Sequence, residues 1–190
     1  MSMLKVGYAL TGSFCTFERT ISQIEGLVKS DMDVLPIMSF NAYNLDTRFG
    51  KAEDFRKRIE GITGNKIIAS IEAAEPIGPK KLVDILVVLP CTGNTLAKLA
   101  NGIYDTPVTL AVKSHIRNQR PVVIGVSSND SLRASARNIG TLLNSNHYYF
   151  IPMKQDDPEK KPFSIVCDFD KTKETVEAAL CGKQIQPILI

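Results

Sequence analysis

The feature that most constrains the fold is an almost unbroken apolar run at residues 82–89, which ends in Ile-Leu-Val-Val-Leu. A strand of this composition is buried on both faces, as central strands of parallel sheets are. Shorter β-rich runs occur at residues 5–10, 34–40, 121–126 and 148–153. Between them, apolar residues recur at helical spacing, for example at Phe14, Phe17, Ile21, Ile24 and Val28. The alternation predicts a three-layer α/β/α sandwich around a mostly parallel sheet.

The other segments fit one domain over residues 1–190, a usual length for a single Rossmann-like or flavodoxin-like domain. Helices are expected at residues 52–62, 67–74, 96–103, 107–118, 132–143 and 172–180. Residues 41–50 are too rich in Asn, Asp and Gly for the interior of an element. Loops are expected at residues 75–81 and 154–162. The segment 151–190 is therefore expected to be a loop, a helix and an apolar tail that packs on the domain or on a neighbour.

Charge and composition argue against several classes of protein. The net charge is only +3 and the Lys and Arg residues are scattered, so no nucleic-acid partner is expected. No apolar run reaches about 18 residues, so no membrane span is expected. The N-terminus lacks the apolar core and cleavage site of a secretory signal, which favours the cytoplasm. The four cysteines are far apart, so neither a metal site nor a disulfide framework is predicted.

Small polar residues lie at the ends of four of the expected strands, at the edge where open α/β sheets bind ligands. They are Thr11, Gly12 and Ser13, then Ser39, then Pro90, Thr92, Gly93, Asn94 and Thr95, and finally Ser127. Each turn alone is also what an ordinary helix N-cap looks like. Four such turns at one edge favour a phosphate-binding site. The first turn has neither the glycine pattern of a dinucleotide fold nor that of a P-loop, so a mononucleotide such as FMN fits best.

One of these turns resembles a family signature. Residues 90–105, Pro-Cys-Thr-Gly-Asn-Thr-Leu-Ala-Lys-Leu-Ala-Asn-Gly-Ile-Tyr-Asp, resemble the P-A-S-A-N-T-x-A-K-x-A-x-G-I-x-D motif of the flavoprotein family of homo-oligomeric FMN enzymes. That family includes phosphopantothenoylcysteine decarboxylases and flavin prenyltransferases. Cys91, Thr92 and Gly93 are small replacements within the motif. The resemblance implies bound FMN, contacted in its phosphate region by Gly12 and Ser13, and a homo-oligomer, often a trimer, with flavins near the boundaries between protomers.

Two departures argue against the decarboxylase branch. Where that branch has a histidine base, eight residues before Asp84, this chain has Pro76, which cannot accept a proton. The two histidines, His115 and His147, lie elsewhere and are expected to be surface or helix-face residues. After the fourth strand the branch has P-A-M-N, whose Asn binds substrate, and here only the Asn is kept, as Asn129.

Three further stretches resemble one particular branch of the family, the B subunits of a two-subunit enzyme of sporulating bacteria: residues 45–50, residues 116–125 with 128–130, and residues 150–162. The resemblance implies an oxidoreductase subunit that acts with an A subunit in the oxidation of a dihydrodipicolinate-type precursor to dipicolinate. The A subunit resembles a nicotinamide-dependent dehydrogenase and is expected to carry NADP(H). The FMN is then either the hydride acceptor or a structural group, and the expected place is the mother-cell cytoplasm.

A dicarboxylate substrate requires positive charge and amide or hydroxyl donors. Arg48, Ser128 and Asn129 are the predicted substrate-binding residues. Arg117, Arg120, Lys160 and Lys161 are weaker candidates that also fit a solvated surface. Asp156 and Asp157 fit either an acid–base pair or an ordinary charged loop, so no catalytic residue is assigned.

Two other functions remain open at this stage. The chain could be a scaffold or regulatory partner of the A subunit that does no chemistry, since the family's base is missing. It could also be another enzyme of the family, a decarboxylase or a flavin prenyltransferase, although Pro76 and the stretches 47–50 and 155–162 argue against these.

Overall fold

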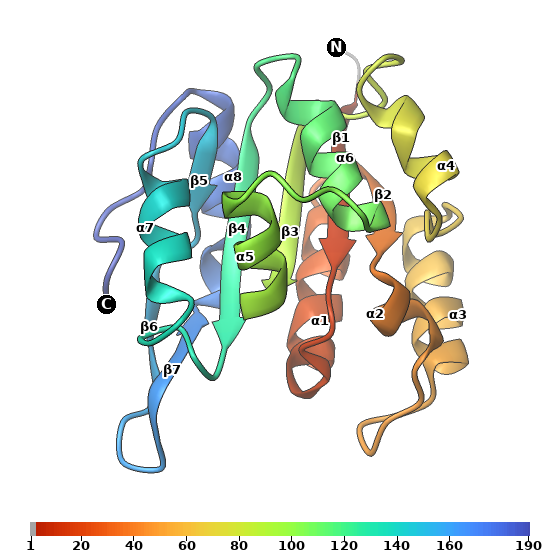
Figure 1. The fold of residues 1–190 in the computed structure, drawn as a ribbon. Coiled ribbons are helices and arrows are strands. Elements are labelled where there is room, and N and C mark those ends of the chain that lie inside the picture. The colour runs from red at the N-terminus through yellow and green to blue at the C-terminus, as the bar shows by residue number, and fades with distance from the viewer. Residues whose placement is uncertain (1–2) are drawn as a thin grey trace.

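A computed structural model describes residues 3–190 and builds them around one twisted sheet (Figure 1). Its strands are β1 (Leu4–Leu10), β2 (Met32–Met38), β3 (Ile85–Cys91), β4 (Val122–Ser128), β5 (Tyr148–Phe150), β6 (Met153–Asp157) and β7 (Lys161–Cys167). The strand order is β2-β1-β3-β4-β7-β6, and β5 also pairs with β4. The pairs among β1 to β5 are parallel, whereas β7 runs antiparallel to β4 and β6.

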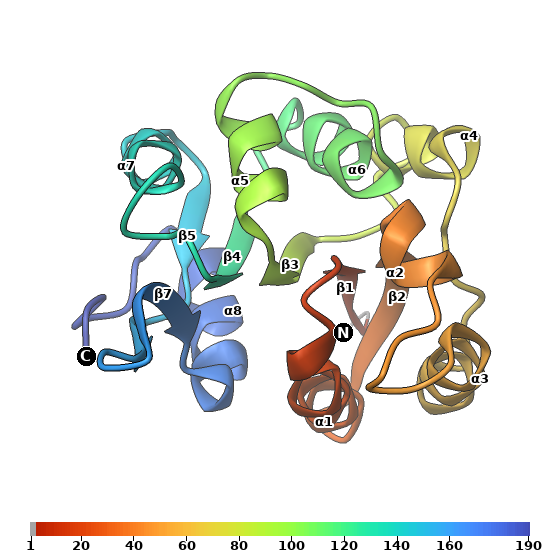
Figure 2. The same cartoon turned by 60° about the horizontal axis from the view of Figure 1, so that its bottom comes forward.

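Helices cover both faces of the sheet (Figure 2). One face carries α1 (Phe17–Val28), α3 (Ala52–Thr63) and α8 (Thr172–Leu180). The other carries α4 (Ile71–Ala74), α5 (Gly93–Ala100), α6 (Pro107–Ile116) and α7 (Ala136–Leu143). A short helix, α2 (Phe40–Asn44), follows β2, and 3-10 turns lie at Phe14–Thr16, Glu75–Ile77 and Phe169–Lys171. The α/β/α sandwich with a mostly parallel sheet is the predicted architecture, and it is confirmed.

The central position of β3 follows from its sequence. All seven of its residues are buried, and they contribute to hydrophobic clusters on both faces of the sheet. Ile85, Val87 and Leu89 pack toward the α1 side, and Leu86 and Val88 pack toward the α6 side. This is the double burial that a continuous apolar run predicts.

The prediction of a loop at residues 154–162 is wrong. These residues form most of an antiparallel hairpin, in which Met153–Gln155 of β6 pairs with Ile165–Cys167 of β7. Ser127 and Ser128 of β4 in turn pair with β7, so the hairpin extends the sheet beyond the end of its parallel part. The outer half of the hairpin is exposed on both faces. It therefore has no alternation of apolar and polar residues, which is the signal that identifies strands in a sequence.

Several predicted boundaries also differ from the structure. Residue 40, expected to end a strand, and residues 41–44 of the polar stretch form α2, because the Ser39 hydroxyl caps that turn by accepting a hydrogen bond from the Ala42 N–H at 3.3 Å. The helix expected from residue 67 begins only at Ile71, after an isolated bridge between Ile68 and Ile37. Residues 75–77 of an expected loop are a 3-10 turn.

The apolar tail lies against the chain itself. Ile188 packs on the α6-side core, and the tail adds to β6 through hydrogen bonds from Met153 N–H to the Ile188 carbonyl and from Ile190 N–H to the Met153 carbonyl. Leu189 and Ile190 remain exposed. Among residues 3–190, every helix is too short or too polar to span a bilayer.

Candidate functional site

The carboxyl ends of the parallel strands lie between two projecting arms (Figure 1). One arm is the loop at residues 45–51 and the other is the β6–β7 hairpin. Two cavities open there. The first, of about 730 Å³, lies between the turn after β1, the end of β4 and both arms. The second, of about 420 Å³, lies between that turn, α2 and the start of α5. Gly12 and Thr92 line both cavities, so the two adjoin.

The turn after β1 is joined to β3 by Thr11. This buried residue donates its hydroxyl to the Pro90 carbonyl at 2.7 Å and accepts the Thr92 N–H at 3.1 Å. Its hydroxyl is thus occupied within the protein, and Thr11 shapes the second cavity more than it offers a donor to it. Pro90 lines neither cavity and contributes its carbonyl to this junction.

The same turn is joined to β4 by a pair of hydroxyls. Ser13 Oγ lies 2.9 Å from Ser127 Oγ, although the two residues are 114 positions apart in the sequence. Both line the first cavity. The structure therefore brings together the predicted turns after the first and fourth strands.

The turn after β3 begins helix α5 and faces the second cavity. Thr92 Oγ1 caps the helix by accepting the Thr95 N–H at 3.4 Å. Asn94 and Thr95 line the cavity. Lys98, one turn further on, also lines it and bonds Asp105 at 2.5 and 2.6 Å. The hydrogen bond from Lys98 lowers the pKa of the Asp105 carboxyl.

The end of β4 carries a hydrogen-bonded cluster around Asp130. Asp130 Oδ1 accepts hydrogen bonds from the hydroxyls of Ser128, at 2.7 Å, and of Ser135, at 2.9 Å. A Cβ added at Gly93 would lie 2.6 Å from Asp130 Oδ1 and from Ser135 Oγ, and 2.7 Å from Ser128 Oγ. Gly93 is thus needed for the close approach of this cluster to α5, although it lines neither cavity itself.

The two arms bring charged side chains to the first cavity. Arg48 comes from the 45–51 loop, and Asp156 and Lys161 come from the hairpin. Lys161 and Asp156 form an ion pair at 2.6 Å across the hairpin, and this hydrogen bond raises the pKa of the Lys161 ammonium. Asn129 also lines the cavity, with its Oδ1 3.5 Å from Ser164 Oγ.

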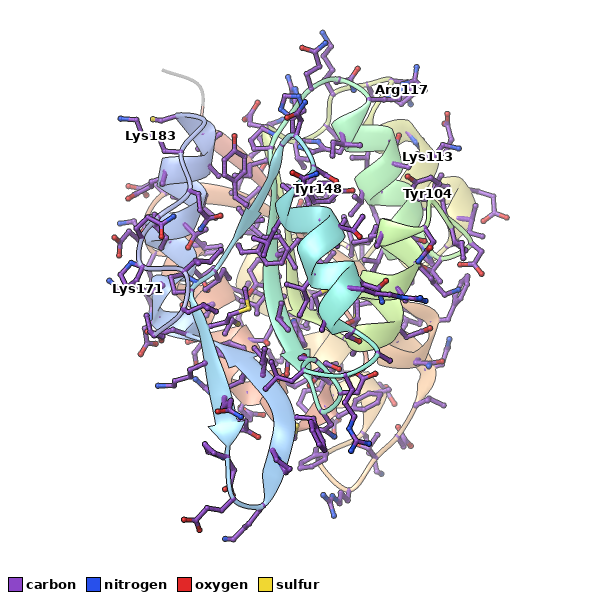
Figure 3. All side chains as sticks on the ribbon, turned by 60° about the vertical axis from the view of Figure 1, so that its left-hand side comes forward. Tyr104, Lys113, Arg117, Tyr148, Lys171 and Lys183 are labelled. Carbon is purple, nitrogen blue, oxygen red and sulfur yellow. The ribbon has the colours of Figure 1, made fainter. Side chains whose placement is uncertain are left out.

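Other charged candidates lie away from the cavities. Arg117 follows α6 at the opposite end of the sheet from the hairpin (Figure 3). Arg120 is bound to the Val83 carbonyl and lies 3.5 Å from Asp84 at that same end. Asp157 accepts the Lys160 N–H at 3.1 Å and so stabilises the hairpin turn. Asp156 and Asp157 therefore have separate partners, Lys161 and the Lys160 N–H.

Several residues that line the cavities have no site assignment from the sequence: Phe14, Cys15, Arg19, Phe49, Lys98, Thr106, Asp130 and Ser164. Asp130 directly follows the predicted Asn129, so its position in the sequence was a usable signal. Arg19 gives no such signal, because it lies on an exposed face of α1 and its stacking partner, Phe169, is distant in sequence. Within residues 3–190, no three His, Cys, Asp or Glu side chains gather as a metal site would require.

Comparison with known proteins adds the family context. The model of the Flavoprotein family matches residues 1–180. The B subunit of dipicolinate synthase from Bacillus subtilis (strain 168) is 47% identical over 193 residues, which span all of this chain and 96% of the relative. The crystal structure of the corresponding B subunit from Bacillus halodurans C superimposes with a TM-score of 0.91 at 41% identity, covering 100% of this chain and 98% of that one.

A more distant structure shares the fold alone. Burkholderia xenovorans DmrB, solved in complex with FMN, superimposes with a TM-score of 0.70 at 18% identity, covering 94% of this chain and 96% of that one.

Proposed function

This chain belongs to the Flavoprotein family, and from that premise we propose that it is the FMN-binding B subunit of a dipicolinate synthase. Its similarity to the Bacillus subtilis B subunit confirms the family and the branch predicted from the sequence. That full-length similarity is the observation that carries the proposal. In the proposed reaction, the chain acts with an A subunit to oxidise a dihydrodipicolinate-type precursor to dipicolinate during sporulation.

The residues around the two cavities have the chemistry that FMN requires. Hydroxyls and an amide converge there from Ser13, Ser39, Thr92, Asn94, Thr95 and Ser127. The start of α5 adds free backbone N–H groups, and Lys98 adds a positive charge to the second cavity. This donor set suits a phosphate and a polyhydroxyl chain. Gly12, Gly93 and Pro90 contribute shape, and Thr11 fixes the turn. FMN bound there supplies a hydride acceptor, which no side chain can provide.

The part of the first cavity beside Arg48 and Asn129 is the proposed substrate site, next to Ser13 and Ser127, which contribute to the proposed flavin site. Arg48 provides a guanidinium for a carboxylate, and Asn129 provides an amide from the end of β4. Ser128, the other residue predicted there, lines the cavity but donates its hydroxyl to Asp130. These groups bind and orient the substrate beside the residues that hold the cofactor. Pro76 lies in a 3-10 turn away from both cavities, so the family's histidine base has no counterpart there, and no residue is assigned as the catalytic base.

The partners of the chain follow from the same proposal. We propose an A subunit that carries NADP(H), a homo-oligomer such as a trimer in which a neighbour completes the flavin site, and a location in the mother-cell cytoplasm. Size-exclusion chromatography with light scattering gives the oligomer count, and mixing with the A subunit gives the stoichiometry of the complex.

The experiment that tests the FMN assignment is a visible absorption spectrum of the purified chain after incubation with FMN and desalting. We expect flavin absorbance at close to one equivalent per chain. Addition of the A subunit and the dihydropyridine dicarboxylate under anaerobic conditions then bleaches the flavin bands if FMN accepts the hydride. A chain that retains no FMN while the A subunit still needs it for dipicolinate formation would instead be a scaffold.

A further inference from the structure

Two arginines without an acidic partner line the first cavity. Arg19 projects from α1, and Arg48 projects from the 45–51 loop. Within residues 3–190, neither guanidinium lies within ion-pair distance of a carboxylate. Lys161, the third cation of the cavity, is paired with Asp156. The cavity therefore contains two guanidinium groups, each without a carboxylate as ion-pair partner among the residues that the structure describes.

Each of these guanidinium groups is held against an aromatic ring. The Cζ of Arg19 lies 4.2 Å from the centre of the Phe169 ring, and the Cζ of Arg48 lies 4.9 Å from the centre of the Phe49 ring. Stacking occupies a flat face of the guanidinium and limits its motion. The N–H donors point outward in the plane of the group, so they stay free to bind a carboxylate in bidentate fashion.

The rest of the cavity suits a small frame between two carboxylates. Phe14, Ile165 and Val166 give it apolar surface, and Asn129 and Ser164 give it neutral polar groups. Of its two acidic side chains, Asp156 is paired with Lys161, and Asp130 Oδ1 is held by the hydroxyls of Ser128 and Ser135. Positive charge is therefore available at the two arginines.

We propose that Arg19 and Arg48 form a two-point clamp that selects ligands with two carboxylates on one small planar frame. The inference rests on the proposed function, whose substrate and product have that form, and deepens it. It assigns Arg19 as a second carboxylate partner, and it makes the preference for a dicarboxylate over a monocarboxylate a property of this chain alone.

The test measures ligand binding to FMN-free protein by isothermal titration calorimetry, since the chain has no tryptophan to report binding by fluorescence. The probes are pyridine-2,6-dicarboxylate and pyridine-2-carboxylate. We expect the wild-type chain to bind the dicarboxylate about 10- to 100-fold more tightly, because a hydrogen-bonded charged contact contributes in that range. Arg19→Gln and Arg48→Gln should each lose most of that preference, and Arg19→Lys and Arg48→Lys should recover part of it.

Arg133→Gln is the matched control. The Arg133 guanidinium also lies over an aromatic ring, 3.7 Å from the centre of Phe163, but it does not line the cavity. Its replacement should leave both affinities unchanged. Equal affinity of the wild-type chain for the two probes would overturn the clamp, as would a loss in Arg133→Gln as large as in Arg19→Gln. Circular dichroism of each variant establishes that it is folded.

The clamp and the proposed function fail separately. FMN retention is measured on the same preparations by absorbance after desalting. A chain that retains FMN but does not distinguish the two probes refutes the clamp and leaves the FMN assignment standing. A chain that distinguishes the probes but retains no FMN refutes that assignment and leaves the clamp standing.

Discussion

At the scale of single residues, Gly93 is one of the positions at which this chain departs from the family motif, which has alanine there. The side chains of Asp130, Ser135 and Ser128 occupy the space that a methyl group would need. We therefore expect Gly93→Ala to lower the free energy of unfolding by about 1–3 kcal/mol, the usual cost of overpacking. Gly140→Ala in α7 is the control, since no atom lies within 4 Å of the added Cβ, and it should stabilise the helix by about 0.5–1 kcal/mol. Urea unfolding followed by circular dichroism measures both. If the free energy of unfolding rose equally in the two variants, the side chains around Asp130 would be able to move aside for the added methyl group without loss of stability.

His115 makes stability depend on pH. It lies on α6, as expected for a helix-face residue, but it is almost fully buried, with Nε2 3.1 Å from the Pro121 carbonyl. Burial lowers its pKa from 6.5 to about 4; Arg120 also lowers it, and the Pro121 carbonyl and Asp84 raise it. The unfolded chain therefore binds a proton between pH 6.5 and 4 that the folded chain does not, so stability falls as the pH falls through that window. The free-energy difference between wild type and His115→Gln should shift by up to about 3 kcal/mol from pH 7 to about pH 4. Titration of the carboxylates affects both proteins alike and cancels in the comparison. If the difference in free energy of unfolding between wild type and His115→Gln did not change with pH, His115 would not be the source of the pH dependence.

At the scale of elements, one side chain completes the edge of β5. Gln184 Oε1 accepts the Phe150 N–H and Gln184 Nε2 donates to the Phe150 carbonyl, both at 2.7 Å. These are the two bonds that a neighbouring strand would supply to this buried residue. Gln184→Ala should cost about 2–3 kcal/mol, because it leaves both backbone groups without a partner. Gln186→Ala removes only one exposed contact, to the Ile188 N–H, and should change stability by less than about 0.5 kcal/mol. Thermal unfolding distinguishes the two, and similar losses would show that the whole tail matters rather than this one amide.

The elements that the sequence predicts well are those whose burial leaves a periodic pattern. β3 and α1 are examples, since each places its apolar residues where the sheet needs them. The β6–β7 hairpin is not predictable in this way, because its outer residues are charged and exposed and its stability comes from pairing across the hairpin. The site divides similarly. The turns at Ser13 and Thr92 follow buried strands and are visible in the sequence, whereas Arg19 enters the site only through tertiary packing.

At the scale of the whole molecule, the adjoining cavities allow cofactor and substrate sites to be separated by mutation. Asn94 lines only the second cavity and Arg48 lines only the first. Asn94→Asp places a negative charge at the start of α5, where the proposed phosphate lies, so we expect FMN affinity to fall by roughly 10-fold or more. It should leave the binding of pyridine-2,6-dicarboxylate to the FMN-free chain unchanged. Arg48→Gln should show the reverse pattern.

Absorbance titration with FMN and calorimetry with the dicarboxylate measure the two affinities on the same protein preparations. If each variant weakened the binding of both ligands equally, the two cavities would be one binding site, and the division between cofactor and substrate residues would be wrong. The reciprocal pattern would place the substrate beside the hairpin and the 45–51 loop. Both arms stand at the carboxyl ends of the parallel strands, and residues of both arms line the first cavity (Figure 1).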